Sequence, residues 1–122
     1  MLDTARACCD LDYPADRFRV IVSDDGADEH IRAGVKVLKL SYPNIYYHAR
    51  VKVKGEPHHA KAGNLVDATA FTDTLDGGPA EFMACLDADM IPMRHWLRTV
   101  VAAHIKDSRL GLVCPPQVGN HI

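Results

Sequence analysis

Two carboxylates, Asp87 and Asp89, follow directly on the apolar run of residues 82–86. The run is short and comes after a Gly-Gly-Pro break, so it is predicted to form a buried strand. In an extended backbone, side chains two residues apart point to the same face, which would bring both carboxylates together at the end of the strand. Paired hard oxygen ligands that leave room for substrate phosphates suit Mg²⁺ or Mn²⁺. By itself, so short a pattern is more often a solvated turn, and it is the position after a predicted buried strand that argues for a divalent metal site.

A second acidic pair, Asp24 and Asp25, follows an apolar run at residues 18–23. The loop 50–61, which carries basic residues and two adjacent histidines, comes after a third such run at 45–49. In open parallel sheets, ligands gather beyond the carboxyl ends of the strands. Both acidic pairs and this loop are therefore predicted to share one edge, where they could hold a metal-bound phosphate ester.

These side chains must be positioned by alternating helices and strands. The spacing of apolar residues predicts helices over 1–11, 28–40, 61–71 and 92–106. The predicted strands are 18–23, 45–49, 82–86 and 110–114. Because the two kinds of element alternate, we expect an α/β fold with a Rossmann-like, mostly parallel sheet and helices on both faces. The length of 122 residues allows one such domain, or part of one.

The composition argues against several function classes. Fourteen basic and 16 acidic residues give a net charge of -2 without a basic block, so nucleic acid is not an expected partner. No apolar run approaches the roughly 18 residues of a spanning helix, and residues 1–4 do not begin a signal peptide, so the chain is expected to be soluble. The four cysteines have no zinc-site or disulfide spacing and are expected to be reduced and mostly buried.

Several conspicuous polar residues have a plainer interpretation than a ligand site. His58 and His59 follow a proline and are predicted to lie in an exposed loop, so we leave them out of the metal set. Arg50, Lys52 and Lys54 alternate with apolar residues and are predicted to line a solvated strand face.

Trp96 could stack on a sugar, but its helical spacing with Met93 and Val100 predicts core packing. Cys85 is likewise predicted to be a buried strand thiol rather than a nucleophile.

The chain resembles family-2 glycosyltransferases, nearest to the cellulose synthase-like processive enzymes. The likeness rests on four motifs in the family's order: Asp12-Tyr13-Pro14 before Ser23-Asp24-Asp25-Gly26; His59-Ala60-Lys61-Ala62-Gly63-Asn64-Leu65; Cys85-Leu86-Asp87-Ala88-Asp89; and Pro115-Pro116-Gln117. It implies a nucleotide-diphospho-sugar transferase fold (glycosyltransferase A-type), incomplete because the first strand and the C-terminal half are missing. Without that first strand, residues 18–23 and 82–86 either pair directly or leave an open sheet edge.

The resemblance implies a role for each acidic and basic match. Asp24 would accept a hydrogen bond from the uracil ring of a UDP-sugar, and Asp25 with the following glycine would shape the turn beneath the nucleotide. Lys61 would offset the charge of the donor diphosphate. Asp87 would face the ribose and the metal, and Asp89 would reach the Mg²⁺ or Mn²⁺ that bridges the diphosphate. Arg50 matches an arginine often present in the family.

The function implied is that of an inverting glycosyltransferase, of the hexosyltransferase type, in polysaccharide biosynthesis. Residues 1–122 would be the partial nucleotide-sugar-binding domain of an enzyme that moves a sugar from a UDP-sugar to a glycan acceptor. No catalytic residue is assigned in the chain, because the family's general base, in a Thr-Glu-Asp-like motif, and its Gln-x-x-Arg-Trp acceptor motif would lie beyond Ile122. We expect the chain alone to bind donor or metal and to transfer no sugar.

The parent enzyme would be an integral membrane protein whose catalytic domain faces the cytosol. Two alternatives stay open at this point. One is a non-catalytic nucleotide- or metal-binding module, and the other is a fragment of a sugar nucleotidyltransferase.

Overall fold

The computed structural model describes residues 1–116. Its elements are α1 (Leu2–Cys9), a 3₁₀ turn η1 (Ala15–Arg17), β1 (Val20–Ser23), α2 (Glu29–Lys39), β2 (Ile45–His48), α3 (Ala60–Asp73) and α4 (Trp96–Lys106). The four predicted helices and the first two predicted strands are confirmed, although α4 begins at Trp96 rather than at Pro92. None of the helices in this part of the chain is long and apolar enough to cross a membrane. Gln117, the last residue of one family motif, lies outside the described residues.

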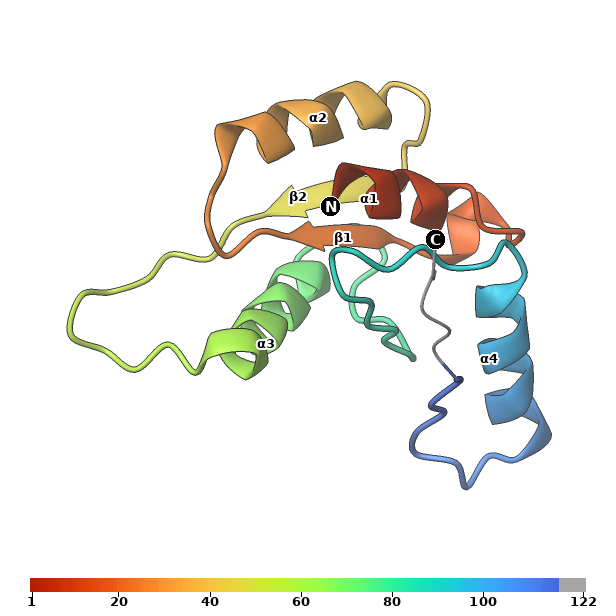
Figure 1. Ribbon diagram of the computed structural model, residues 1–122. Helices are drawn as coiled ribbons and strands as arrows, with labels where there is room; N and C mark the ends of the chain where they lie inside the picture. Colours follow the sequence, from red (N-terminus) through yellow and green to blue (C-terminus); the bar gives the residue numbers. More distant parts are fainter. Residues whose placement is uncertain (117–122) are drawn as a thin grey trace.

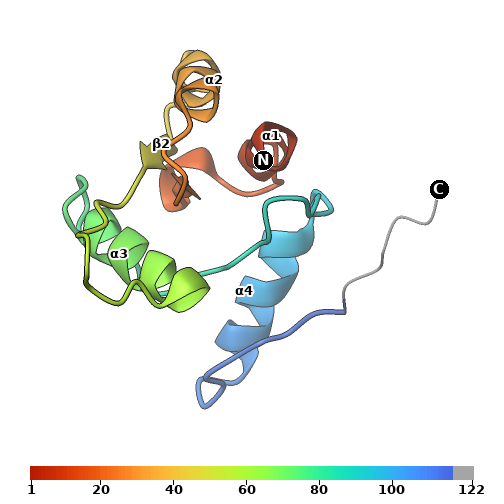
Figure 2. The same ribbon diagram turned by 60° about the vertical axis from the view of Figure 1, so that its left-hand side comes forward.

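The sheet consists of β1 and β2, which pair in parallel with Val20 opposite Ile45 and Ser23 opposite His48. Helix α2 connects the two strands and so forms the crossover that a parallel pair requires. Helices α1 and α2 lie on one face of the sheet and α3 on the other (Figures 1 and 2). The predicted α/β architecture, a parallel sheet with helices on both faces, is therefore confirmed for a small sheet.

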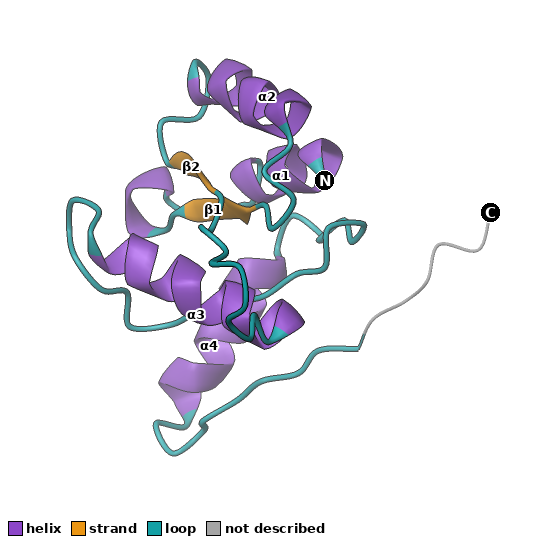
Figure 3. Ribbon diagram, turned by 90° about the vertical axis from the view of Figure 1, so that its left-hand side faces the viewer, coloured by secondary structure: helices purple, strands orange, loops and turns teal. Residues whose placement is uncertain are grey.

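The predictions of strands at 82–86 and 110–114 were wrong. Within residues 1–116 the sheet has two strands, and both segments are drawn as loops in Figure 3. Met83 and Leu112 are 66% and 81% exposed. An apolar run becomes a strand when a neighbouring strand takes up its backbone hydrogen bonds, and neither segment has such a neighbour in this part of the chain. Of the two alternatives, the open sheet edge is the one observed, because residues 82–86 do not pair with β1.

The hydrophobic core lies between the sheet and the two helices on its first face. Ile45 is fully buried at its centre, and the cluster is completed by Ala5, Cys9, Val22, Val35 and Leu38. Helix α2 presents Val35 and Leu38 to this core, and its first turn is capped by Asp28, whose side chain accepts a hydrogen bond from the His30 amide at 2.7 Å.

Two burial predictions were wrong for the second half of the chain. Helix α4 buries none of its residues; Met93 is 68% exposed and Trp96 is partly buried. Cys85 and Cys114 are exposed, because the strands that were to bury them do not form. At the other end of the chain, burial raises the pKa of the Cys8 and Cys9 thiols to about 11, so these thiols stay protonated.

The segment between α3 and α4 is tied back to the sheet and to α1 by side chains. The Arg19 guanidinium, beside β1, donates to the carbonyl oxygens of Gly78 at 2.7 Å and Thr72 at 3.3 Å. The Thr4 hydroxyl of α1 donates to the Ala88 carbonyl at 2.8 Å. These contacts fix the position of residues 87–89 although no strand leads into them.

Candidate functional site

Asp24 builds the turn that follows β1. Its side-chain oxygens accept hydrogen bonds from the backbone amides of Gly26 (3.1 Å) and Asp28 (2.7 Å) and from the Tyr47 hydroxyl (2.9 Å). The residue is 6% exposed. Burial, together with the bond to the Asp24 carboxylate, raises the pKa of Tyr47. We expected Asp25 and the glycine after it to shape this turn, but Asp24 makes the contacts that do so.

Asp25 is more open and is held by two cations. Arg50 donates to its two oxygens at 2.5 and 3.3 Å, and the Lys52 ammonium lies 2.7 Å from Oδ2. Hydrogen bonds from Arg50 first and Lys52 second lower the pKa of Asp25 below its ordinary value of 3.8. The same hydrogen bonds stabilise the ionised form of Asp25, so this carboxylate is charged at neutral pH.

The lowered pKa of Asp25 gives a prediction about pH. Because the folded-state pKa lies below 3.8, ionised Asp25 stabilises the fold above that value, and the contribution is lost as the pH falls through the lower folded pKa. We expect the Asp25 carboxyl carbon of the folded chain, followed by NMR, to titrate with a midpoint below 3.8, and Lys52→Met to raise that midpoint. A midpoint at or above 3.8 would contradict the ion pairs.

The loop after β2 differs from the predicted solvated strand face. Strand β2 ends at His48, and the next residues form the long loop that reaches out beyond the sheet before α3 in Figure 1. The Arg50 side chain is 7% exposed, so its assignment to a solvated face was wrong. Lys52 and Lys54 are exposed as expected, and Lys52 binds Asp25.

Lys61 lies in the first turn of α3, and its ammonium contacts Oδ1 of Asp87. The hydrogen bond to the Asp87 carboxylate raises the pKa of Lys61, so the ammonium stays charged. Both side chains are largely exposed, at 69% and 51%. The ion pair therefore contributes little to the stability of the fold. Lys61 or Asp87 can give up this contact and bind a ligand with little loss of free energy.

Asp87 and Asp89 lie in a turn and not at the end of a strand. The Met90 amide donates to the Asp87 carbonyl at 3.0 Å and closes the turn. The argument from side-chain alternation in an extended backbone therefore does not apply. Both aspartates are exposed, and the bond from Thr4 to the carbonyl between them anchors the turn to α1.

The two acidic pairs are linked by one continuous line of contacts. Asp25 binds Arg50, Arg50 also donates to the Ala60 carbonyl at 3.4 Å, and the next residue, Lys61, contacts Asp87. The carboxyl end of β1, the loop after β2, the start of α3 and the 87–90 turn are thus connected. These contacts join one aspartate of each pair to the basic loop, although the second pair does not follow a strand as predicted.

Two shallow hollows occur within residues 1–116, and one of them lies beside these contacts. One, of about 460 Å³, is lined by Arg50, His58, His59, Gly63 and Asp67 among others. His59 is exposed, as predicted for the histidine loop, and His58 is partly buried. Among residues 1–116, no three side chains of His, Cys, Asp or Glu gather closely enough to hold a metal ion on their own.

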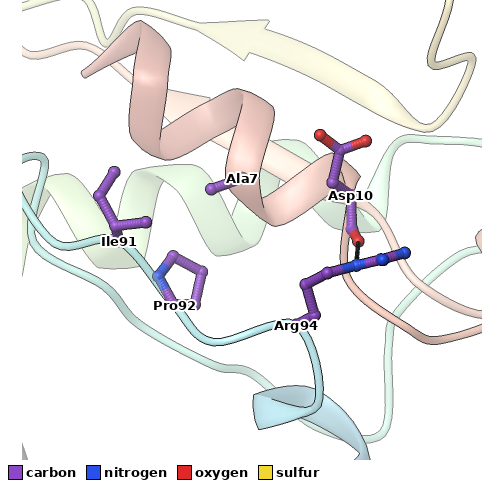
Figure 4. A pocket seen from close by; sticks show the side chains of 5 residues that line it. All are labelled: Ala7, Asp10, Ile91, Pro92 and Arg94. Atoms are coloured by element: carbon purple, nitrogen blue, oxygen red, sulfur yellow. Dashed lines mark hydrogen bonds between the residues drawn. The ribbon is translucent and has the colours of Figure 1, made fainter.

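The other hollow, of about 490 Å³, lies between α1 and the segment before α4 (Figure 4). Arg94 donates there to the backbone carbonyl of Asp10 at 3.3 Å. The Asp10 carboxylate is engaged by the Tyr42 hydroxyl at 2.7 Å, and Ile91 and Pro92 form an apolar wall. This hollow brings together none of the predicted site residues.

The structure adds contacts that the sequence did not indicate. Asn64, from the motif that contains Lys61, bonds Ser23 at the end of β1 (Oγ to Oδ1, 2.9 Å) and so docks α3 on the sheet. His48 bonds Asp67 at 2.5 Å and stacks on Phe71 at 4.5 Å between ring centroids. The buried role of Arg50 was also missed, although its match to a family arginine was a signal for it.

Comparisons with known proteins agree with the motifs. Residues 2–120 match the family model described as Glycosyl transferase family 2. The chain is 31% identical over 106 residues to the cellulose synthase catalytic subunit [UDP-forming] of Pseudomonas fluorescens (strain SBW25), which covers 87% of this chain. It is 32% identical over 118 residues to putative cellulose synthase 2 of Komagataeibacter xylinus, which covers 93% of this chain.

The matched regions are small parts of these relatives. The chain spans 12% of the Pseudomonas fluorescens protein and 6% of the Komagataeibacter xylinus protein. No solved structure gives a significant match to the chain.

Proposed function

Because the chain belongs to glycosyl transferase family 2, we propose that it forms the donor-binding part of an inverting glycosyltransferase that uses a UDP-sugar and a divalent metal. The sugar would be a hexose, transferred to a glycan acceptor in polysaccharide synthesis by a larger, membrane-embedded enzyme. The Pseudomonas fluorescens relative is named as UDP-forming, which supports UDP as the leaving group here.

The observation that carries the proposal is the contact between Lys61 and Asp87. A carboxylate that already holds an ammonium is a place where positive charge is stabilised. Asp89, in the same exposed turn, adds a second group of hard oxygen ligands. One or two carboxylates completed by phosphate oxygens and water are the donor set that Mg²⁺ and Mn²⁺ take in nucleotide sites. When bound, such an ion would act as a Lewis acid and offset the charge on the departing UDP.

The remaining residues would bind and orient the nucleotide. Lys61 would exchange its contact with Asp87 for one with the diphosphate oxygens. There the positive charge of the ammonium would offset the negative charge of the phosphates. The Asp24 carboxylate has three donors in the structure and, with about four acceptor positions per carboxylate, keeps about one for the uracil ring. Asp25 lies beside it at the same edge. We place the general base and the acceptor site outside residues 1–122.

Calorimetric titration of the 122-residue chain with UDP, with and without Mn²⁺, tests the proposal. We expect UDP to bind with Mn²⁺ and more weakly, by about tenfold or more, without it, because Asp87 and Asp89 would hold the ion and its charge would offset that of the diphosphate. Lys61→Met should weaken binding of UDP with Mn²⁺, whereas Lys106→Met, at the exposed end of α4, should not. UDP binding that is absent, or indifferent to Mn²⁺, would contradict the proposed function.

A further inference from the structure

Arg50 is a buried cation at the centre of the candidate site. Its side chain is 7% exposed, and arginines are almost never buried unless they are paired. Besides the two bonds to Asp25, the guanidinium donates to the backbone carbonyls of His58 at 2.5 Å and Ala60 at 3.4 Å. One side chain thereby joins the turn after β1 to the segment that leads into α3.

The segment leading into α3 has a strained backbone. His59 and Ala60 have φ values of 55° and 44°, in the left-handed region that residues with a Cβ rarely adopt. Each such residue costs on the order of 1 kcal/mol or more, and persists where its surroundings hold it. His59 is also the N-cap of α3, and its side chain makes no capping hydrogen bond. The two bonds from Arg50, to carbonyls on either side of His59, are contacts that can hold this conformation.

The position of Gly63 leaves the space that Arg50 uses. A Cβ atom at residue 63 would lie 2.4 Å from Nη1 of Arg50 and 2.0 Å from the His58 carbonyl oxygen. Both distances are too short for real contacts, so any larger residue would displace the guanidinium or the loop. Because glycine has no side chain, it leaves room for the hydrogen bond from Arg50 to the His58 carbonyl.

We propose that Arg50 is a positioning residue for donor binding, which clamps the entry of α3 against Asp25 and so holds Lys61 at the 87–90 turn. Arg50 acts through Lys61 and need not contact the nucleotide. The planar guanidinium can donate to a carboxylate and to two carbonyls at once, whereas the compact ammonium of lysine cannot span them. The part of this inference that concerns the nucleotide rests on the proposed function.

Amide hydrogen exchange of the 122-residue chain tests the clamp without any ligand. Arg50→Lys should speed exchange at residues 58–64 by about tenfold or more, because the strained entry opens locally. Lys52→Met is the matched control, since Lys52 also binds Asp25 but belongs to the exposed loop, and it should leave exchange at 58–64 unchanged. Gly63→Ala should reproduce the effect of Arg50→Lys. Unchanged exchange at 58–64 in Arg50→Lys would overturn the inference, whether or not the chain binds UDP.

A double-mutant cycle tests whether the clamp acts through Lys61. Arg50→Lys should weaken binding of UDP with Mn²⁺ about tenfold in the wild-type chain and by much less in the Lys61→Met chain, because the two residues are coupled. An equal loss in both backgrounds would overturn the positioning role. If the wild-type chain binds no UDP, the proposed function fails together with the nucleotide part of the inference, and the exchange data still decide the clamp.

Discussion

Replacing Asp87 or Asp89 with asparagine is expected to abolish Mn²⁺-dependent binding of UDP. Asparagine keeps the size of the side chain and removes the negative charge that attracts a divalent ion. Each single change should weaken binding by at least about tenfold, and the double change should cost little more, because residues that serve one site act as a unit. Titration calorimetry with UDP and Mn²⁺ measures the loss.

Controls separate this effect from a loss of folding. The melting temperature should hardly change in either variant, since both carboxylates are exposed and the bond from Asp87 to Lys61 is a surface ion pair. Asp73→Asn, which changes an exposed carboxylate at the C-terminal end of α3, should leave UDP binding intact. Affinity in Asp87→Asn and Asp89→Asn equal to that of Asp73→Asn would contradict the metal site.

Ile45→Ala is expected to cause the largest loss of stability among alanine truncations of the core found in residues 1–116. Ile45, the first residue of β2, is fully buried in the core cluster with Val35 and Leu38 of α2. Truncation of such a residue costs about 2–5 kcal/mol through lost burial and the cavity left behind. Domains of this kind are stable by only about 5–15 kcal/mol, so much of the chain's stability would be lost. The free energy of unfolding in urea measures the effect.

Two further variants calibrate that result. Ile45→Val, which removes one methyl group, should cost about 0.5–1.5 kcal/mol. Leu40 is 87% exposed, so Leu40→Ala should change the free energy of unfolding by no more than about 0.5 kcal/mol. If Ile45→Ala and Leu40→Ala had equal effects, the core described here would not be the one that stabilises the chain.

The elements that could be predicted from the sequence are those specified by local signals. Helix α2 is an example, since Asp28 caps its start and Val35 and Leu38 recur at the spacing of one helix face. Residues 82–86 show the limit of such signals. Their composition is that of a strand, but a strand also requires a partner for its backbone, and apolar composition cannot show whether the partner is present.

The candidate site could be predicted in its positions more than in its contacts. Asp25, Lys61 and Asp87 are connected through Arg50, but not at the ends of two strands as the order of the elements implied, because residues 82–86 form no strand. The sequence does not show that Asp24 holds the turn while Asp25 binds Arg50. These roles depend on which carboxylate accepts hydrogen bonds from the backbone amides of the turn. Arg50 was missed for a similar reason: its burial depends on the backbone of His59 and on the space beside Gly63, and both are set by the tertiary structure.

Paramagnetic broadening by Mn²⁺ in the NMR spectrum of the 122-residue chain, recorded with UDP, tests the central claim most directly. If the ion binds between the acidic turn and the nucleotide, amide signals of residues 87–90, Lys61 and residues 24–26 should disappear first, while those of residues 36–40, at the end of α2, should persist. Broadening centred on His58 and His59, or spread evenly over the chain, would contradict a metal and donor site at Asp87 and Asp89.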